Sequence, residues 1–98
     1  MTVNKRQLSG CTAVEIVNRL GQGADPWSSV FDVVDYLRQC GPIAFISDEE
    51  YNRFRFATKS RQYDMVRCAL VRAYRANMLD RAVGDVRRNR EVYVYRTI

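Results

Sequence analysis

A chain of 98 residues with 47% hydrophobic and 28% charged side chains is long enough for one folded core and too apolar for intrinsic disorder. No apolar run approaches the roughly 18 to 20 residues of a membrane span, and the first residues, MTVNKRQLSG, lack the apolar region of a signal peptide. We therefore expect a single cytoplasmic domain over residues 1–98, with no membrane partner.

The net charge of +5 is unevenly distributed along the chain. Residues 1–52 carry four basic and seven acidic side chains, and residues 53–98 carry twelve basic and four acidic ones, so the formal charges of the two halves are −3 and +8. A field gathered on one part of a protein attracts a partner of opposite sign. The asymmetry favours a polyanion or an acidic protein surface as the partner.

The sequence offers little for catalysis. Histidine is absent, which removes the commonest metal ligand and the commonest general base near neutral pH. Cys11, Cys40 and Cys68 are odd in number and far apart, unlike a disulfide framework or a zinc site, and we interpret them as reduced thiols. The acids of residues 48–50 adjoin a helix start, where capping explains them better than a metal does. We predict no enzyme activity, no metal and no cofactor.

Two helices are expected in the first part of the chain. Ser9 or Thr12 can cap a short helix that runs to about Leu20, before two glycines. A second helix should begin with Asp25 as its N-cap and Pro26 in its first turn, and end near Cys40. Its apolar residues recur at helical spacing and should face the core; they are Trp27, Val30, Phe31, Val34 and Leu37.

The middle of the chain predicts a short strand and two more helices. The run PIAFIS, residues 42–47, is too brief for a helix and has β-type character. Ser47 and Glu50 have the spacing of a capping box at the start of a helix over about 48–57. Ser60 can cap the longest helix, over about 61–79. One face of that helix collects Tyr63, Val66, Ala69, Leu70, Ala73 and Asn77, and the other carries Arg61, Arg67, Arg72 and Arg75.

The end of the chain predicts a β-hairpin. AVGDV and EVYVYRTI alternate as strands do, with Val92 and Val94 on one face and Tyr93 and Tyr95 on the other. The turn between them contains Arg87, Arg88, Asn89 and Arg90. So many like charges on one turn either form a solvated tip or meet a negative partner.

This order of elements resembles the winged helix-turn-helix family. VVDYLRQCGPIAFI resembles its first helix and strand, SDEEYNRFRFATK its second helix, SRQYDMVRCALVRAYRANMLDR its third helix, and AVGDVRRNREVYVY its wing. The resemblance implies an α+β, mostly helical fold with a winged-helix core over 25–98 and an additional helix in an N-terminal extension over 1–24.

The resemblance also implies a function, sequence-specific binding of double-stranded DNA by a small bacterial or phage transcriptional regulator. In DNA-binding members the third helix enters the major groove and the wing reaches the backbone or the minor groove. The residues that this assigns to DNA are Arg61, Gln62, Arg67, Arg72, Arg87, Arg88, Asn89 and Arg90. Arginine and glutamine can pair with guanine and adenine, and arginine on a phosphate releases counterions.

Several alternatives stay open at this point. Gln62 could instead help cap its helix, Tyr63 could belong to the core, and Arg72 could lie in solvent or meet an acidic partner. Phe54, Phe56, Tyr93 and Tyr95 could stack on bases but are more typical of core or cross-strand pairs.

Assembly and partner also stay open. A regulator of this kind reads two half-sites as a homodimer. Val14, Val17 and Leu20 offer a dimer surface, unless they pack on their own domain. The rival function is a protein-interaction module of the same shape that binds an acidic protein partner.

Overall fold

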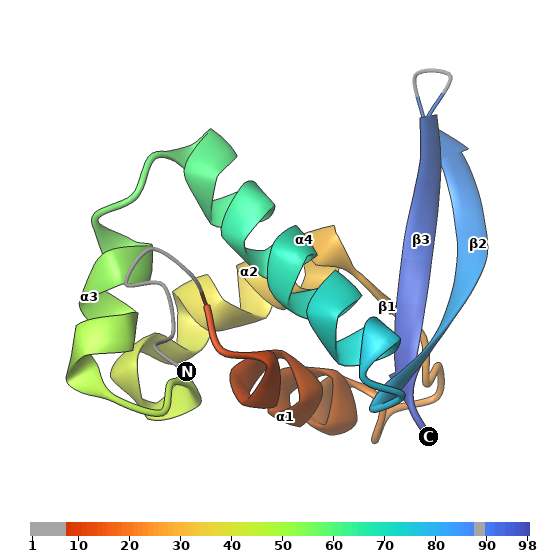
Figure 1. Cartoon of the computed structure of the whole chain (residues 1–98), viewed down its shortest axis with the longest axis horizontal. Coiled ribbons are helices and arrows are strands. Elements are labelled where there is room, and N and C mark those ends of the chain that lie inside the picture. Colours follow the sequence, from red (N-terminus) through yellow and green to blue (C-terminus); the bar gives the residue numbers. More distant parts are fainter. Residues whose placement is uncertain (1–7, 88–89) are drawn as a thin grey trace.

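The structure is a computed structural model that describes residues 8–87 and 90–98, with the backbone alone for 85–87, 90 and 91. This part of the chain forms helices α1 (Gly10–Leu20), α2 (Val30–Cys40), η1 (Gly41–Ala44, a 3-10 helix), α3 (Asp48–Arg55) and α4 (Lys59–Arg75), and strands β1 (Ser28–Ser29), β2 (Leu79–Arg87) and β3 (Arg90–Thr97). The helices gather on one side and the sheet closes the other (Figure 1). The predicted α+β class is confirmed.

Helix α1 begins where its N-cap predicts. The Ser9 hydroxyl accepts a hydrogen bond from the Cys11 backbone N–H, and the helix ends before Gly21. Val17 is fully buried, and Val14 and Leu20 pack against the core. These three residues therefore pack on their own domain, the other of the two alternatives.

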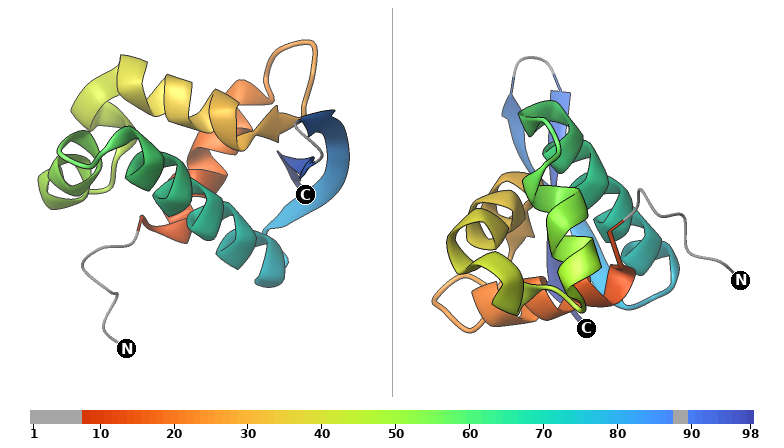
Figure 2. Two further views of the ribbon diagram at one scale, coloured as in Figure 1. Left: turned by 90° about the horizontal axis from the view of Figure 1, so that it is seen from above. Right: turned by 90° about the vertical axis from the view of Figure 1, so that its left-hand side faces the viewer.

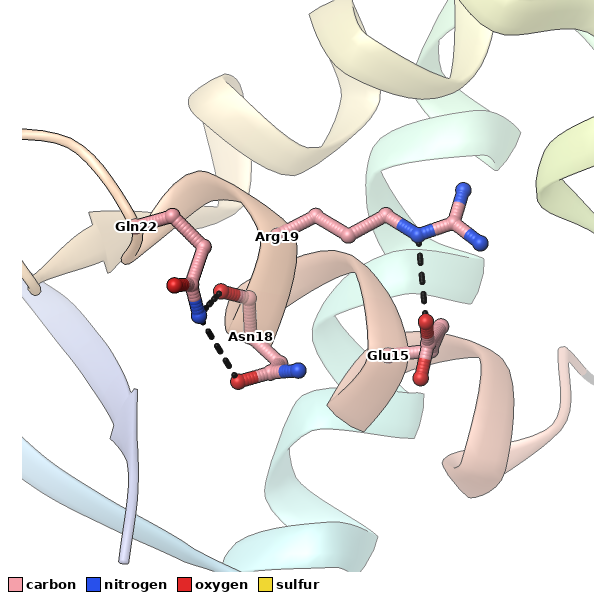
Figure 3. Close-up of polar contacts among 4 residues, drawn as sticks. All are labelled: Glu15, Asn18, Arg19 and Gln22. Carbon is pink, nitrogen blue, oxygen red and sulfur yellow. Dashed lines mark hydrogen bonds and ion pairs between the residues drawn. The ribbon is translucent and has the colours of Figure 1, made fainter.

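The outer side of α1 satisfies its own polar groups (Figure 3). Arg19 Nε donates to the Glu15 carboxylate at 3.1 Å, one helical turn away. Gln22 Nε2 donates to the backbone carbonyl and to the side-chain oxygen of Asn18, at 3.1 and 3.3 Å. On this face Arg19 is therefore paired within the helix itself.

Helix α2 begins four residues later than predicted. Ser29 caps it, and the reciprocal bonds of Ser29 and Asp32 complete a capping box. The Asp25 carboxylate instead accepts from the Trp27 N–H at 3.0 Å, which makes a local turn. The downstream cap prevails because it satisfies two backbone donors and leaves Ser28 and Ser29 to pair with β3.

The prediction of a strand at PIAFIS, residues 42–47, is wrong. Gly41, with a φ of 66°, ends α2, and Pro42 lies in the first turn of η1. The chain then runs extended into Ser47, with Phe45 buried while Ile43 and Ile46 are 80% and 64% exposed. A strand needs a partner, and both edges of β3 are already occupied by β1 and β2.

Helices α3 and α4 form close to their predicted places. Ser47 caps α3, and Thr58 rather than Ser60 caps α4, accepting from the Arg61 N–H. Helix α4 ends at Arg75, four residues short of the prediction. Asn77, predicted on the apolar face, is exposed with a φ of 61°, a left-handed conformation that ends helices.

The sheet has the antiparallel order β1-β3-β2. Tyr95 of β3 lies opposite both Ser28 and Arg81, and a register shift separates Val83 from Asp85. Leu79 and Tyr95 are buried on the face that packs against the helices. The predicted hairpin is confirmed, and Arg81 contacts both Tyr93 and Tyr95, so the two tyrosines share a face as predicted.

One core joins all the helices and the sheet. Of the residues predicted for the core face of α2, Val34 and Leu37 are buried, and Trp27, Val30 and Phe31 are half-buried. The buried apolar cluster consists of Leu8, Ala13, Ile16, Val17, Val33, Val34, Leu37, Ala44, Phe45, Phe54, Met65, Val66, Ala69, Leu70, Ala73, Leu79 and Tyr95.

Two further findings bear on the expected class of protein. No disulfide joins Cys11, Cys40 and Cys68. Over residues 8–87 and 90–98, none of the helices combines the length and the apolar character needed to cross a membrane.

Candidate nucleic-acid interface

The N-terminal end of α4 presents cationic side chains on the surface. Lys59 and Arg61 are exposed in the first turn, directly after the Thr58 cap. Two views show that this end of α4 and the outer end of the β2–β3 hairpin lie on the same side of the molecule (Figures 1 and 2). The amide N–H groups of a helix start also favour anions. A polyanion laid across this side would meet the helix end and the hairpin together.

Gln62, which the resemblance assigns to DNA, is buried and bound within the protein. It is 8% exposed. Its Oε1 accepts from Arg38 Nε and Nη2 at 2.9 and 2.7 Å, and its Nε2 donates to the Phe54 carbonyl at 3.0 Å. The amide thus joins α2, the end of α3 and α4 through hydrogen bonds inside the protein.

Tyr63 packs against the core, which is the alternative that the sequence left open for this residue. Its ring packs edge-on against Phe31 with a centroid distance of 5.4 Å, and the Arg38 guanidinium lies 5.5 Å from its centroid. Arg38, which the sequence did not single out, therefore secures two neighbouring residues of α4.

Arg67 is exposed but paired. Its Nη2 donates to Asp64 Oδ1 at 2.6 Å, and that hydrogen bond raises the pKa of Arg67 above its ordinary value. The pair lies on the surface, where such bridges contribute little to stability. A phosphate at Arg67 would compete with Asp64, so this position is weaker for DNA than the sequence indicated.

Arg72 contacts a part of the chain that is distant in the sequence. Its side chain is half-buried, and Nη2 donates to the Leu8 carbonyl, which lies just before α1. The guanidinium holds the N-terminal segment against α4 and does not project toward a ligand. Arg75, in the last turn, is exposed at the opposite end of α4 from Arg61.

The arginine-rich turn cannot be assessed from the structure. Arg88 and Asn89 lie outside the described residues, as do the side chains of Arg87 and Arg90. The backbones of Arg87 and Arg90 pair as the last rung of the hairpin. These four residues remain a prediction from the sequence.

The aromatic residues divide into two groups. Phe54 and Tyr95 are buried. Phe56 is 74% exposed, with the Arg55 guanidinium 4.5 Å from its ring centroid, and Tyr93 is 37% exposed beneath Arg81. The core interpretation therefore holds for Phe54 and Tyr95.

Two surface cations escaped the sequence analysis. Lys59 lies before the helix start that a Ser60 cap predicts, but Thr58 is an equally good cap and places Lys59 in the first turn. Arg81 sits between the rings of Tyr74 and Tyr93, each 4.2 Å away. This contact joins the last turn of α4 to the sheet, and no local sequence pattern indicates it.

Comparison with known proteins provides no guide to this interface, since no family model, no curated protein and no solved structure matches the chain. The proposals below therefore depend on the chain's own geometry and chemistry.

Proposed function

We propose that the protein binds double-stranded DNA with a winged helix-turn-helix arrangement, in which α4 enters the major groove and the β2–β3 hairpin contacts the backbone or the minor groove. The observation that carries this proposal is that the N-terminal end of α4 and the outer end of the hairpin lie on the same side of the molecule (Figure 1). Lys59 and Arg61 are exposed at the N-terminal end of α4, and the arginine-rich turn belongs to the sequence of the hairpin.

The chain order supports the arrangement. A three-residue turn, 56–58, joins α3 to α4, which suits a helix-turn-helix. The hairpin follows α4, and a third strand completes its sheet. That strand is β1, which precedes α2, rather than the PIAFIS segment. Helix α1 is an integral part of the fold that we propose, because Ala13, Ile16 and Val17 share the common core.

The DNA-contacting residues that we propose are fewer than the sequence suggested. Lys59 and Arg61 meet the duplex at the helix start, and Arg87, Arg88 and Arg90 neutralise phosphates at the wing. We leave Gln62 and Arg72 out of the proposed contacts because both make hydrogen bonds inside the protein. We further propose that the protein acts as a transcriptional regulator and that a homodimer occupies two half-sites.

The first experiment measures binding to random-sequence duplexes by fluorescence anisotropy between about 50 and 200 mM salt. Replacing Arg87 and Arg88 by alanine should weaken binding to all sequences and reduce the log–log salt slope by roughly 1 to 2 units, since each lost phosphate contact removes about one counterion. An unchanged slope removes the wing from the interface.

The second experiment tests recognition by α4. Arg61→Ala should cost roughly 1 to 3 kcal/mol on a selected site and relax the preference at one base pair. Arg75→Ala, at the far end of the same helix, is the matched control and should leave the preference unchanged. The measurement is selection from randomised duplexes. A parent protein that selects nothing above background contradicts specific DNA binding.

A further inference from the structure

A second surface of defined chemistry lies away from the proposed DNA contacts. The Arg81 guanidinium lies 4.2 Å from the ring centroids of both Tyr74 and Tyr93, so side chains of α4, β2 and β3 form one stack. Val83 follows two residues after Arg81 on the same strand face and is 54% exposed. We call these four residues the Arg81 face.

The Arg81 face is exposed because the sheet is longer than the helical layer that covers it. At the base of the hairpin, Leu79 and Tyr95 are 1% and 3% exposed on the covered face. Farther along the same face, Tyr93 and Val83 are 37% and 54% exposed, and Tyr74 of α4 is 36% exposed at the border. Aromatic residues and arginine are the types enriched at protein interfaces.

Among the side chains that the structure describes, this face carries the cation of Arg81 and no carboxylate. Asp80, the acid adjacent to Arg81, points to the opposite face of the sheet, where it pairs with Arg96 at 3.3 Å. No ion pair involves Arg81 within the described part of the chain. The charge therefore calls for an acid from a partner.

The adjoining backbone is an outer strand. Strand β2 pairs with β3 alone, so its other edge lies at the rim of the sheet (Figure 1). The register shift after Val83 interrupts regular pairing, so Leu79–Val83 is an uninterrupted stretch of this edge. Such an edge can accept an extended segment as an additional strand.

We propose that an extended, acidic segment of another protein pairs with the Leu79–Val83 edge of β2, placing a carboxylate on Arg81 and an apolar side chain on Val83. The two partner residues are two positions apart because side chains on one face of a strand recur every second residue. The tyrosine rings hold the guanidinium in place, so less side-chain entropy is lost on binding.

Two other occupants fit less well. A second copy would bring Arg81 near Arg81, with no carboxylate on the described part of the face to separate them. Nucleobases need the faces of aromatic rings, and Arg81 already covers one face of Tyr74 and one of Tyr93.

The test uses a fluorescein-labelled peptide of repeating Thr-Glu-Thr-Val, with the matching Thr-Lys-Thr-Val peptide as control, in anisotropy titrations of the full chain. The glutamate peptide should bind and the lysine peptide should not. Arg81→Gln should weaken binding roughly tenfold or more, as loss of a central arginine does. Arg96→Gln removes the same charge from the opposite face and should change binding less than about twofold.

A second variant guards against a folding defect. Val83→Glu leaves the stack in place but puts a carboxylate on the face, and it should also weaken binding roughly tenfold by repulsion. Circular dichroism confirms the fold of each variant. Arg61→Ala, which tests DNA binding, should leave peptide binding unchanged, so the two proposals fail separately.

Several outcomes overturn the inference. The first is that the glutamate peptide fails to bind the parent protein. The second is that Arg81→Gln and Arg96→Gln weaken peptide binding equally, which would indicate a diffuse electrostatic attraction. Arg81-dependent binding of single-stranded oligothymidine assigns the face to nucleic acid. Arg81-dependent self-association in sedimentation assigns it to a second copy.

Discussion

The Thr12 hydroxyl of α1 donates a hydrogen bond of 2.6 Å to the Glu50 carboxylate of α3, and both residues are buried. The Ser47 hydroxyl accepts from the Glu50 backbone N–H. The Glu50 side chain reaches α1 instead of returning to the Ser47 N–H, so the capping box that the sequence predicts is only half formed. A residue typical of a helix start thereby fastens α3 to the N-terminal helix.

Thr12→Val should lower the free energy of unfolding by about 1 to 3 kcal/mol, because it removes the donor from a buried carboxylate while keeping the side-chain shape. Thr12→Ser keeps the hydroxyl and should cost clearly less. Urea denaturation of the three proteins measures the difference. Equal losses for valine and serine would show that packing of the threonine methyl, and not its hydrogen bond, is what matters.

Leu37→Ala tests the placement of α2. Leu37 is 1% exposed in the common core, and large-to-small changes at such sites cost about 2 to 5 kcal/mol through lost burial and the cavity left behind. Gln39→Ala, on the exposed side of the same helix, is the control and should be near neutral. A loss below about 0.5 kcal/mol for Leu37→Ala in denaturant unfolding contradicts this core position.

Gly84 tests the packing inside the hairpin. A Cβ at this position would lie 2.5 Å from a Val94 methyl carbon, so Gly84→Ala should destabilise the protein by about 1 to 3 kcal/mol through overpacking. Val94→Ala should recover part of that loss in the double variant. Thermal unfolding of the four proteins gives the coupling energy. Strictly additive effects would mean that the two residues do not touch.

The Tyr95 hydroxyl should make stability fall in alkali. Burial raises the pKa of Tyr95 above its ordinary 10.0, although the hydrogen bond from Arg81 opposes the shift. The folded state therefore keeps its proton where the unfolded state has lost it, and stability declines as pH rises from the unfolded pKa through the folded one. Tyr95→Phe should flatten this decline in denaturant unfolding at pH values above about 9. Parallel curves for the two proteins would exclude Tyr95 as the cause.

Elements with one dominant local signal could be predicted from the sequence. The caps Ser9 and Ser47 give α1 and α3 their starts, and the alternation around Tyr93 gives the hairpin. Each of these signals operates within a few residues of the structure that it determines.

Elements that depend on distant partners could not. Asp25 and Ser29 are both good caps, and the choice between them is linked to the pairing of Ser28 with Tyr95. PIAFIS has the apolar character of a strand but no sheet edge to join. The local pattern contains neither fact.

The candidate site was predictable in its charge but not in its geometry. Outward arginines on α4 follow from helical periodicity, and Arg61 and Arg67 are indeed exposed. Gln62 and Arg72 have the same local signature, yet the Phe54 carbonyl and the Leu8 carbonyl bind them from elsewhere in the fold. Residue type alone does not show whether a polar side chain lies at the surface or is bound by a distant part of the fold.

The pairing of β1 with β3 has a consequence for biosynthesis. Ser28 and Ser29 find their partners, Tyr95 and Val94, near the opposite end of the chain. During translation the first strand therefore leaves the ribosome long before the strand that it pairs with, while the contacts of α1 with α2 can form earlier. Closing so long a loop slows folding. We expect the helical part of a nascent chain to become compact first and the sheet to close only once β3 has emerged.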